Sequence, residues 1–176
     1  MRPTARAWAA MPLMAFVSLS SAPSLAADPC SGFTWDVSRE LTLFAGPAVS
    51  LAAGADSGAA PTLAMDRLYV LALRPLKEVS FVAAPGKRNG AESGYAGLAT
   101  LDIKAPGKYR FALDVPAWID VIADGGAMNT SGHQGASGCT GPRKIVEFEF
   151  SVARRVTLQF SGADVPAIRI TVTPTR

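Results

Sequence analysis

The sequence predicts an all-β protein: an antiparallel, jelly-roll-like β-sandwich of about eight strands with one short helix near the N-terminus. Three observations support this fold class. Apolar residues alternate with polar ones along several short segments, 16 Gly and 13 Pro supply turns between them, and helical periodicity is confined to one stretch. With 49% apolar and 18% charged residues, the chain also has enough apolar surface for a core and too little charge for a disordered tail or a coiled coil.

The first 26 residues have the three-part layout of a secretory signal peptide. Two arginines open the segment, an uncharged and mostly apolar run covers residues 7–19, and the small residues Ser24 and Ala26 fit a cleavage site after Ala26. A membrane anchor needs about 20 apolar residues, which this run does not provide. We therefore expect residues 27–176 to form a single exported β-sandwich domain, periplasmic or secreted, without stable membrane insertion after cleavage.

Removal of this segment changes the charge of the chain. The formal net charge of +3 falls to +1, because both arginines of the segment are lost and all the acidic residues remain. A near-neutral chain lacks the basic surface that nucleic-acid binding requires. We therefore expect no nucleic acid among the partners, and the sequence indicates no cofactor.

The one expected helix covers residues 37–44. Asp36 stands before it as a candidate N-cap, and Val37, Leu41 and Phe44 recur at helical spacing on one side. This spacing indicates a short amphipathic helix with a single apolar face.

The first strands have a less regular period of two. Tyr109 and Phe111 share a face after a Pro-Gly turn, and the mostly apolar segment Trp118–Ala123 fits a central strand closed by the turn residues Asp-Gly-Gly. Further candidate strands cover residues 48–52, 66–73, 77–83 and 98–103.

The clearest strand pattern lies in the last third of the chain. Apolar and polar side chains alternate along residues 145–152, which predicts that Phe148 faces the core and Glu147 faces solvent. Residues 156–161 and 168–173 repeat the alternation. The short links between these three strands predict antiparallel hairpin-type returns.

Two long polar loops are expected, at residues 84–97 and 127–142. The second carries Cys139 and the only histidine, His133. Cys30 and Cys139 are the two cysteines of the chain, so a disulfide between them is the expected state in an oxidising compartment. Reactive or metal-binding thiols are the alternative, although neither cysteine belongs to a CxxC or Cys/His cluster.

Four segments resemble the pre-peptidase C-terminal (PPC-type) domains of secreted bacterial proteins: GKYRF at 107–111, AWIDV at 117–121, RKIVEF at 143–148 and VTLQFSG at 156–162. The resemblance covers about residues 98–172 and implies a non-catalytic β-sandwich of the kind usually appended to secreted hydrolases. Short exported chains similar to this one also carry the name homogentisate dioxygenase. A ferrous site of that type needs two histidines and a carboxylate, and the chain has His133 alone.

The candidate ligand or metal site consists of His133, Asp120 and Asp124. His133 could serve as a general base or metal ligand, and carboxylates at strand ends could bind a cation through their oxygens. The structural alternative is a solvated loop histidine and aspartates that cap turns, which is the usual role of Asp at such positions.

Two classes of function therefore remain open. The first is an exported non-catalytic protein of the cell envelope, a binding or accessory module for an envelope polymer, a small molecule or another protein. The second is a small secreted enzyme, a hydrolase or metal-dependent oxidoreductase, that uses His133 and nearby carboxylates. The structural character of the strongest motifs favours the first.

Overall fold

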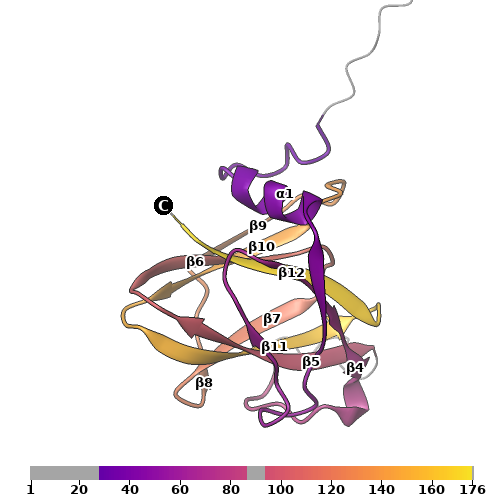
Figure 1. Cartoon of the computed structure of the whole chain (residues 1–176), viewed down its shortest axis with the longest axis vertical. Helices are drawn as coiled ribbons and strands as arrows, with labels where there is room; N and C mark the ends of the chain where they lie inside the picture. Colours follow the sequence, from indigo (N-terminus) through magenta and orange to yellow (C-terminus); the bar gives the residue numbers. More distant parts are fainter. Residues whose placement is uncertain (1–27, 87–93, 176) are drawn as a thin grey trace, which may run out of the picture.

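The structure is a two-layered β-sandwich with one helix packed on the outer face of one sheet (Figure 1). The computed structural model describes residues 28–86 and 94–175. The prediction of an all-β sandwich with one short N-terminal helix is confirmed. The expected signal peptide at residues 1–26 lies outside the described residues.

Sheet A has the strand order β1-β3-β12-β6-β10-β9. Its strands are β1 (Ala48–Ala52), β3 (Leu68–Ala72), β6 (Gly107–Leu113), β9 (Gly132–Gly135), β10 (Lys144–Phe150) and β12 (Ala167–Pro174). Sheet B has the order β2-β5-β11-β7-β8, and β4 also pairs with β5. Its strands are β2 (Thr62–Leu63), β4 (Arg74–Pro75), β5 (Tyr95–Ile103), β7 (Trp118–Ala123), β8 (Gly126–Ala127) and β11 (Arg154–Ala163).

The long strands alternate between the two sheets along the chain. β5, β7 and β11 lie in sheet B, whereas β6, β10 and β12 lie in sheet A. The expected hairpin pairing of the last three strands is therefore wrong, because the links before and after β11 cross from one sheet to the other. The alternation of apolar and polar residues along a strand shows which of its faces is buried. It does not show which other strand lies beside it.

Two of the strand pairs are parallel, which corrects the expectation of a purely antiparallel sandwich. β1 runs parallel to β3 in sheet A, and β2 runs parallel to β5 in sheet B. Both β1 and β2 are terminal strands of their sheets. The chain enters β1 from α1 and crosses to the other sheet before and after β2, so neither parallel pair is joined by a tight hairpin.

The main core lies between the sheets and contains the apolar residues that alternate along the strands. Phe111, Phe148 and Phe160 are fully buried there, and the rings of Phe111 and Phe148 meet edge to face with centroids 5.3 Å apart. The predicted core position of Phe148 is thus confirmed.

A second core lies on the outer face of sheet A. The helix α1 (Ser38–Ala45) and the residues before it cover this face with Phe33, Val37 and Phe44, which pack against Ile145 of β10. Asp36 Oδ1 accepts a hydrogen bond from Ser38 N at 3.0 Å, one position before the N-cap residue, Val37. The helix and its apolar side are as expected, but the helix begins one residue later than predicted, so Asp36 is not its N-cap.

This second core corrects the expected position of Glu147. Its side chain points away from the main core, but it is only 7% exposed, because the N-terminal segment covers that face of the sheet. Ser131 Oγ donates to Glu147 Oε1 at 3.0 Å, and Lys108 Nζ and Arg110 Nε lie 3.3 and 3.5 Å from its carboxylate oxygens. Glu147 is therefore the acceptor of a buried polar cluster.

Residues 77–83 do not form the expected strand. A 3₁₀ turn, η1 (Leu76–Glu78), begins the segment, and an irregular stretch follows over the outer face of sheet B. The buried side chain of Gln159 holds this stretch: its Oε1 accepts from Val82 N and Ala83 N, and its Nε2 donates to Ala83 O. Half-buried side chains in a covering loop produced the same alternation as a strand would.

The predicted disulfide is present. Cys30 and Cys139 are bonded across a sequence separation of 109 residues, and Cys139 belongs to the second core. Residues 127–142 were expected to form one long loop. This prediction is wrong in part, because β9 forms within them and pairs with β10. Part of the expected loop at residues 84–97 lies outside the described residues, and its last residues begin β5.

We expect the double substitution Cys30→Ser with Cys139→Ser to lower the free energy of unfolding by about 2–5 kcal/mol, because it opens the longest covalent loop of the fold. Urea unfolding followed by circular dichroism measures the change. Thiol titration of the denatured, unreduced parent is the control and should find no free thiol. A double variant as stable as the parent would contradict the structural role of the bond.

Glu147→Lys should lower the free energy of unfolding by about 2–3 kcal/mol, because the new ammonium replaces the acceptor of Lys108, Arg110 and Ser131. Glu149→Lys, on the exposed position two residues later, is the matched control and should change stability by less than about 0.5 kcal/mol. Equal effects of the two substitutions would show that the second core does not cover this face.

Candidate functional site

His133 lies in β9, the last strand of sheet A. It stands opposite Val146 in the ladder, so its side chain is on the face that looks toward sheet B, and it is exposed because β9 is at the edge. His133 was expected in an irregular loop, and it lies instead in a strand at the edge of the sheet.

Asp120 lies in the other sheet, in β7, where it pairs with Gln159 of β11. Its neighbours Ile119 and Val121 belong to the main core, so Asp120 points to the outer face of the sheet. It is 7% exposed, and both oxygens are used: Oδ1 accepts from Trp118 Nε1 at 2.8 Å and Oδ2 from Gly86 N at 3.2 Å. These bonds attach Gly86 and the indole of Trp118 to the sheet.

Asp124 occupies the turn between β7 and β8. It and Gly125 have φ of 51° and 79°, the left-handed pair that a two-residue hairpin turn requires. The side chain of Asp124 is 86% exposed, and its Oδ2 accepts a hydrogen bond from Arg154 at 2.7 Å. Asp124 thus takes the structural role that Asp-Gly sequences usually have.

The structure does not bring His133 together with Asp120 and Asp124. His133 lies at the edge of sheet A on its inner face, whereas Asp120 lies on the outer face of sheet B. In residues 28–86 and 94–175, no three side chains of His, Cys, Asp or Glu are grouped so that they could hold a metal ion.

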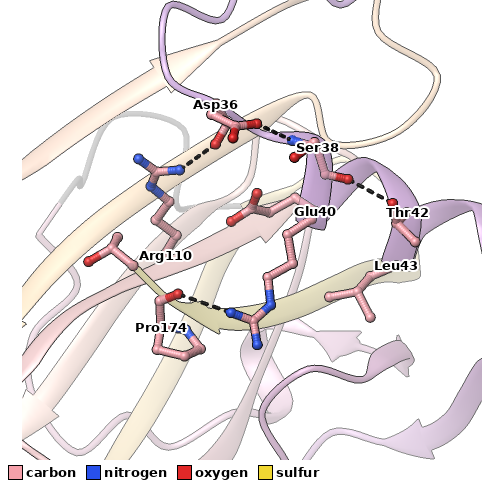
Figure 2. A pocket seen from close by; sticks show the side chains of 9 residues that line it. Asp36, Ser38, Glu40, Thr42, Leu43, Arg110 and Pro174 are labelled. Atoms are coloured by element: carbon pink, nitrogen blue, oxygen red, sulfur yellow. Dashed lines mark hydrogen bonds between the residues drawn. The ribbon is translucent and has the colours of Figure 1, made fainter.

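A different polar site lies beside the N-terminal end of α1. A hollow of about 460 Å³ opens there between the helix, β6 and the end of β12, and we call it the α1 hollow (Figure 2). Most of the residues that line it carry polar or charged groups, although their carbon atoms also contribute to its walls; the lining comprises Asp36, Ser38, Arg39, Glu40, Thr42, Leu43, Arg110, Pro174 and Thr175.

Arg110 forms one wall of the α1 hollow. Its NH1 donates to the carbonyl oxygen of Asp36 at 2.7 Å, and its guanidinium lies 4.7 Å from the centre of the Trp35 ring. Nε is buried and has no hydrogen-bond partner among the described residues, although Glu147 lies at ion-pair distance. Stacking on Trp35 and the bond to Asp36 thus hold the guanidinium in one orientation.

Glu40 lies at the base of the α1 hollow, between the helix and sheet A. It is 2% exposed, and its Oε1 accepts a hydrogen bond from Thr173 Oγ1 at 2.5 Å. Arg39, next to it, extends to the other side, where NH2 lies 2.6 Å from Asp66 Oδ2 and NH1 donates to Pro174 O. The hollow therefore presents cationic and anionic groups within one small volume.

Neither Glu40 nor Arg110 was among the sequence-based candidates, although the sequence contains a signal for each. Glu40 follows Val37 by three residues and precedes Phe44 by four, so it falls on the apolar face of the helix, where an acid needs a partner. Arg110 alternates with the core residues Tyr109 and Phe111, which places it on the other face of its strand, where a cation needs a partner if the face is covered.

Another ion pair lies on sheet B, away from the α1 hollow. Arg155 Nε of β11 lies 2.8 Å from Asp102 Oδ1 of β5. The hydrogen bond from Arg155 holds the pKa of the Asp102 carboxyl below its ordinary value. The pair joins two neighbouring strands at the surface and has no catalytic geometry.

The sequence matches no model of a known protein family and none of the curated proteins with which it was compared. None of the helices in the described part of the chain is long and apolar enough to cross a membrane.

Asp120→Ala should lower the free energy of unfolding by about 1–3 kcal/mol, because Trp118 Nε1 and Gly86 N lose their acceptor. His133→Ala should change it by less than about 0.5 kcal/mol, since the side chain is exposed. Urea unfolding monitored by tryptophan fluorescence measures both. A larger effect of His133→Ala than of Asp120→Ala would contradict this assignment of roles.

Proposed function

We propose that the chain is an exported, non-catalytic β-sandwich protein of the cell envelope that acts as a binding or accessory module, in the periplasm or outside the cell. The layout of residues 1–26 supports export. The Cys30–Cys139 bond supports an oxidising compartment, since protein disulfides persist there and are rare in the cytosol.

The observation that carries the binding role is the α1 hollow. Three elements of the fold contribute donors and acceptors to it, and its volume of about 460 Å³ is in the range of small-molecule sites. Arg110 is positioned by Trp35 and Asp36, and Ser38 and Thr42 add hydroxyl groups at the helix start. Such a lining suits a small polar molecule, or a segment of a polar envelope polymer, better than an apolar ligand.

The resemblance to PPC-type domains supports the same proposal. Those domains are non-catalytic companions of secreted hydrolases, and the four segments that carry the resemblance here belong to two pairs of neighbouring strands, β6 with β10 and β11 with β7. The partner could also be another envelope protein.

The alternative was a small secreted enzyme built on His133, Asp120 and Asp124. It would require these side chains to meet, but they lie on different sheets, and Asp120 already accepts two hydrogen bonds. The binding module is therefore the function that the geometry supports better.

The test fills the α1 hollow. Ser38 is exposed and lines it, so Ser38→Trp should block it while leaving the backbone bond from Ser38 N to Asp36 intact. The probes are isolated peptidoglycan, by co-sedimentation, and a panel of sugars, amino acids and small carboxylates, by thermal shift. A bound small molecule at about 100 times its Kd should stabilise the parent by about 2.7 kcal/mol.

Ser57→Trp is the matched control, since Ser57 is exposed in a distant loop and does not line the hollow. We expect Ser38→Trp to lose the binding and Ser57→Trp to retain it. The proposal fails if no probe binds the parent protein, or if Ser38→Trp binds as well as the parent does.

A further inference from the structure

Sheet A has an open edge at β1, the strand that leads away from the end of α1 (Figure 1). β1 is the first strand of its sheet and pairs only with β3. Its five residues, Ala48–Ala52, make it the longest terminal strand in the described part of the chain. The other terminal strands are β9 with four residues and β2 and β8 with two each.

The backbone polar groups of three of the five residues of β1 point to this open edge. Ala53 N, just after the strand, donates to Ala72 O, so alternation along the chain directs Val49 and Leu51 to β3. The N–H and C=O groups of the intervening residues Ala48, Ser50 and Ala52 then point away from β3. None of these three makes a backbone hydrogen bond to the rest of residues 28–86 and 94–175.

The edge lacks the charged residues that usually prevent pairing between molecules. Natural sheet edges are commonly protected by Lys, by other charges, by bulges or by very short strands. Residues 41–55 contain no Asp, Glu, Lys or Arg, and the pairing of β1 with β3 has no bulge. The short strands β2 and β8 at the edges of sheet B show the protection that β1 does not have.

We propose that β1 pairs antiparallel with β1 of a second copy of this chain, so that the two A sheets become one continuous sheet across a twofold axis. The axis passes between the two Ser50 residues. Ala48 then faces Ala52 of the other copy, and all the outward-pointing backbone groups find partners, because residues 48, 50 and 52 are symmetric about the centre of the strand.

The second copy fits this edge better than an unrelated peptide does, because twofold pairing sets the strand against itself. Any charged residue at position 50 would face its own like charge, and the strand has none. The half-buried Val49 would stand opposite Leu51 of the other copy, and both pack at the rim of the main core. Pairing therefore extends the apolar core as well as the backbone ladder.

The proposed contact is small. One pair of five-residue strands buries less than the roughly 1,200 Å² of a stable interface, so the dimer should dissociate on dilution. Sedimentation velocity of the mature protein over a roughly 100-fold range of concentration should show a reversible change from monomer to dimer.

The decisive variants are Ser50→Lys and Ser50→Glu. Each places like charges against each other at the axis, so each variant alone should be monomeric at every concentration. An equimolar mixture of the two should form the dimer again, because opposite charges then face each other. Ser151→Lys, at an exposed bend before β11, is the matched control and should dimerise like the parent.

Hydrogen exchange gives an independent readout that needs no substitution. The amide of Ser50 should exchange slowly in concentrated protein and rapidly after dilution, whereas the amides of Val49 and Leu51, bonded to β3, should stay protected in both. A parent that stays monomeric over the whole range overturns the proposal, and so does dimerisation of Ser50→Lys alone. A monomer that instead binds extended peptides along β1 overturns the choice of partner.

Discussion

The structure depends on the docking of the N-terminal segment and α1 against the outer face of sheet A. A sandwich needs only the core between its sheets, but here the outer face of one sheet is also apolar in part, with Leu68, Ala112 and Ile145 buried on it. Phe33, Val37 and Phe44 cover this face, and the Cys30–Cys139 bond prevents the covering segment from leaving it. The α1 hollow is lined by this helix, and β1 begins directly after it, so the positions of both depend on this docking.

The interface between α1 and sheet A is polar on one side and apolar on the other. Phe44, near the end of the helix, belongs to one apolar cluster with Ala112 and Ile145, whereas Glu40 accepts a hydrogen bond from Thr173 near the start of the helix. A buried acid opposite a strand hydroxyl contributes less free energy than a pair of apolar side chains would, but it allows few alternative positions for the helix. The hollow opens on this polar side, so the groups that fix the helix are also the groups that line the candidate site.

The sequence predicted the fold class and the helix because these depend on local patterns, and it predicted the disulfide because two cysteines allow a single pairing. Phe148 is in the core because alternate residues of a strand share a face, and that rule needs no knowledge of the neighbours. The assignment of strands to sheets, by contrast, depends on contacts between distant segments, and the short links around β11 fit either a hairpin or a crossing.

The same limit explains the missed site. Glu147 was predicted to face solvent, and Arg110 was not a candidate, because nothing in their own strands indicated that residues 30–45 would cover that face. The local pattern also gave no information on which strands pair beside His133 and Asp120. The two residues are close in the sequence, but His133 lies in a strand of sheet A and Asp120 in a strand of sheet B.

The open edge of β1 follows from the same alternation. After β1 the chain crosses at once to sheet B, where Gly54 and Leu98 exchange backbone hydrogen bonds in both directions. The crossing is tight: a Cβ at Gly54 would lie 2.6 Å from Ala60 N, and one at Gly97 would lie 2.5 Å from Ala53 Cβ, so both positions require glycine. Because β2 then pairs with β5 in the other sheet, the returning chain adds β3 on the inner side of β1, and no segment of the described chain is left to pair with its outer side. The exposed ladder is therefore a consequence of how the two sheets are connected, and its neutral sequence is what makes it able to pair with its own copy.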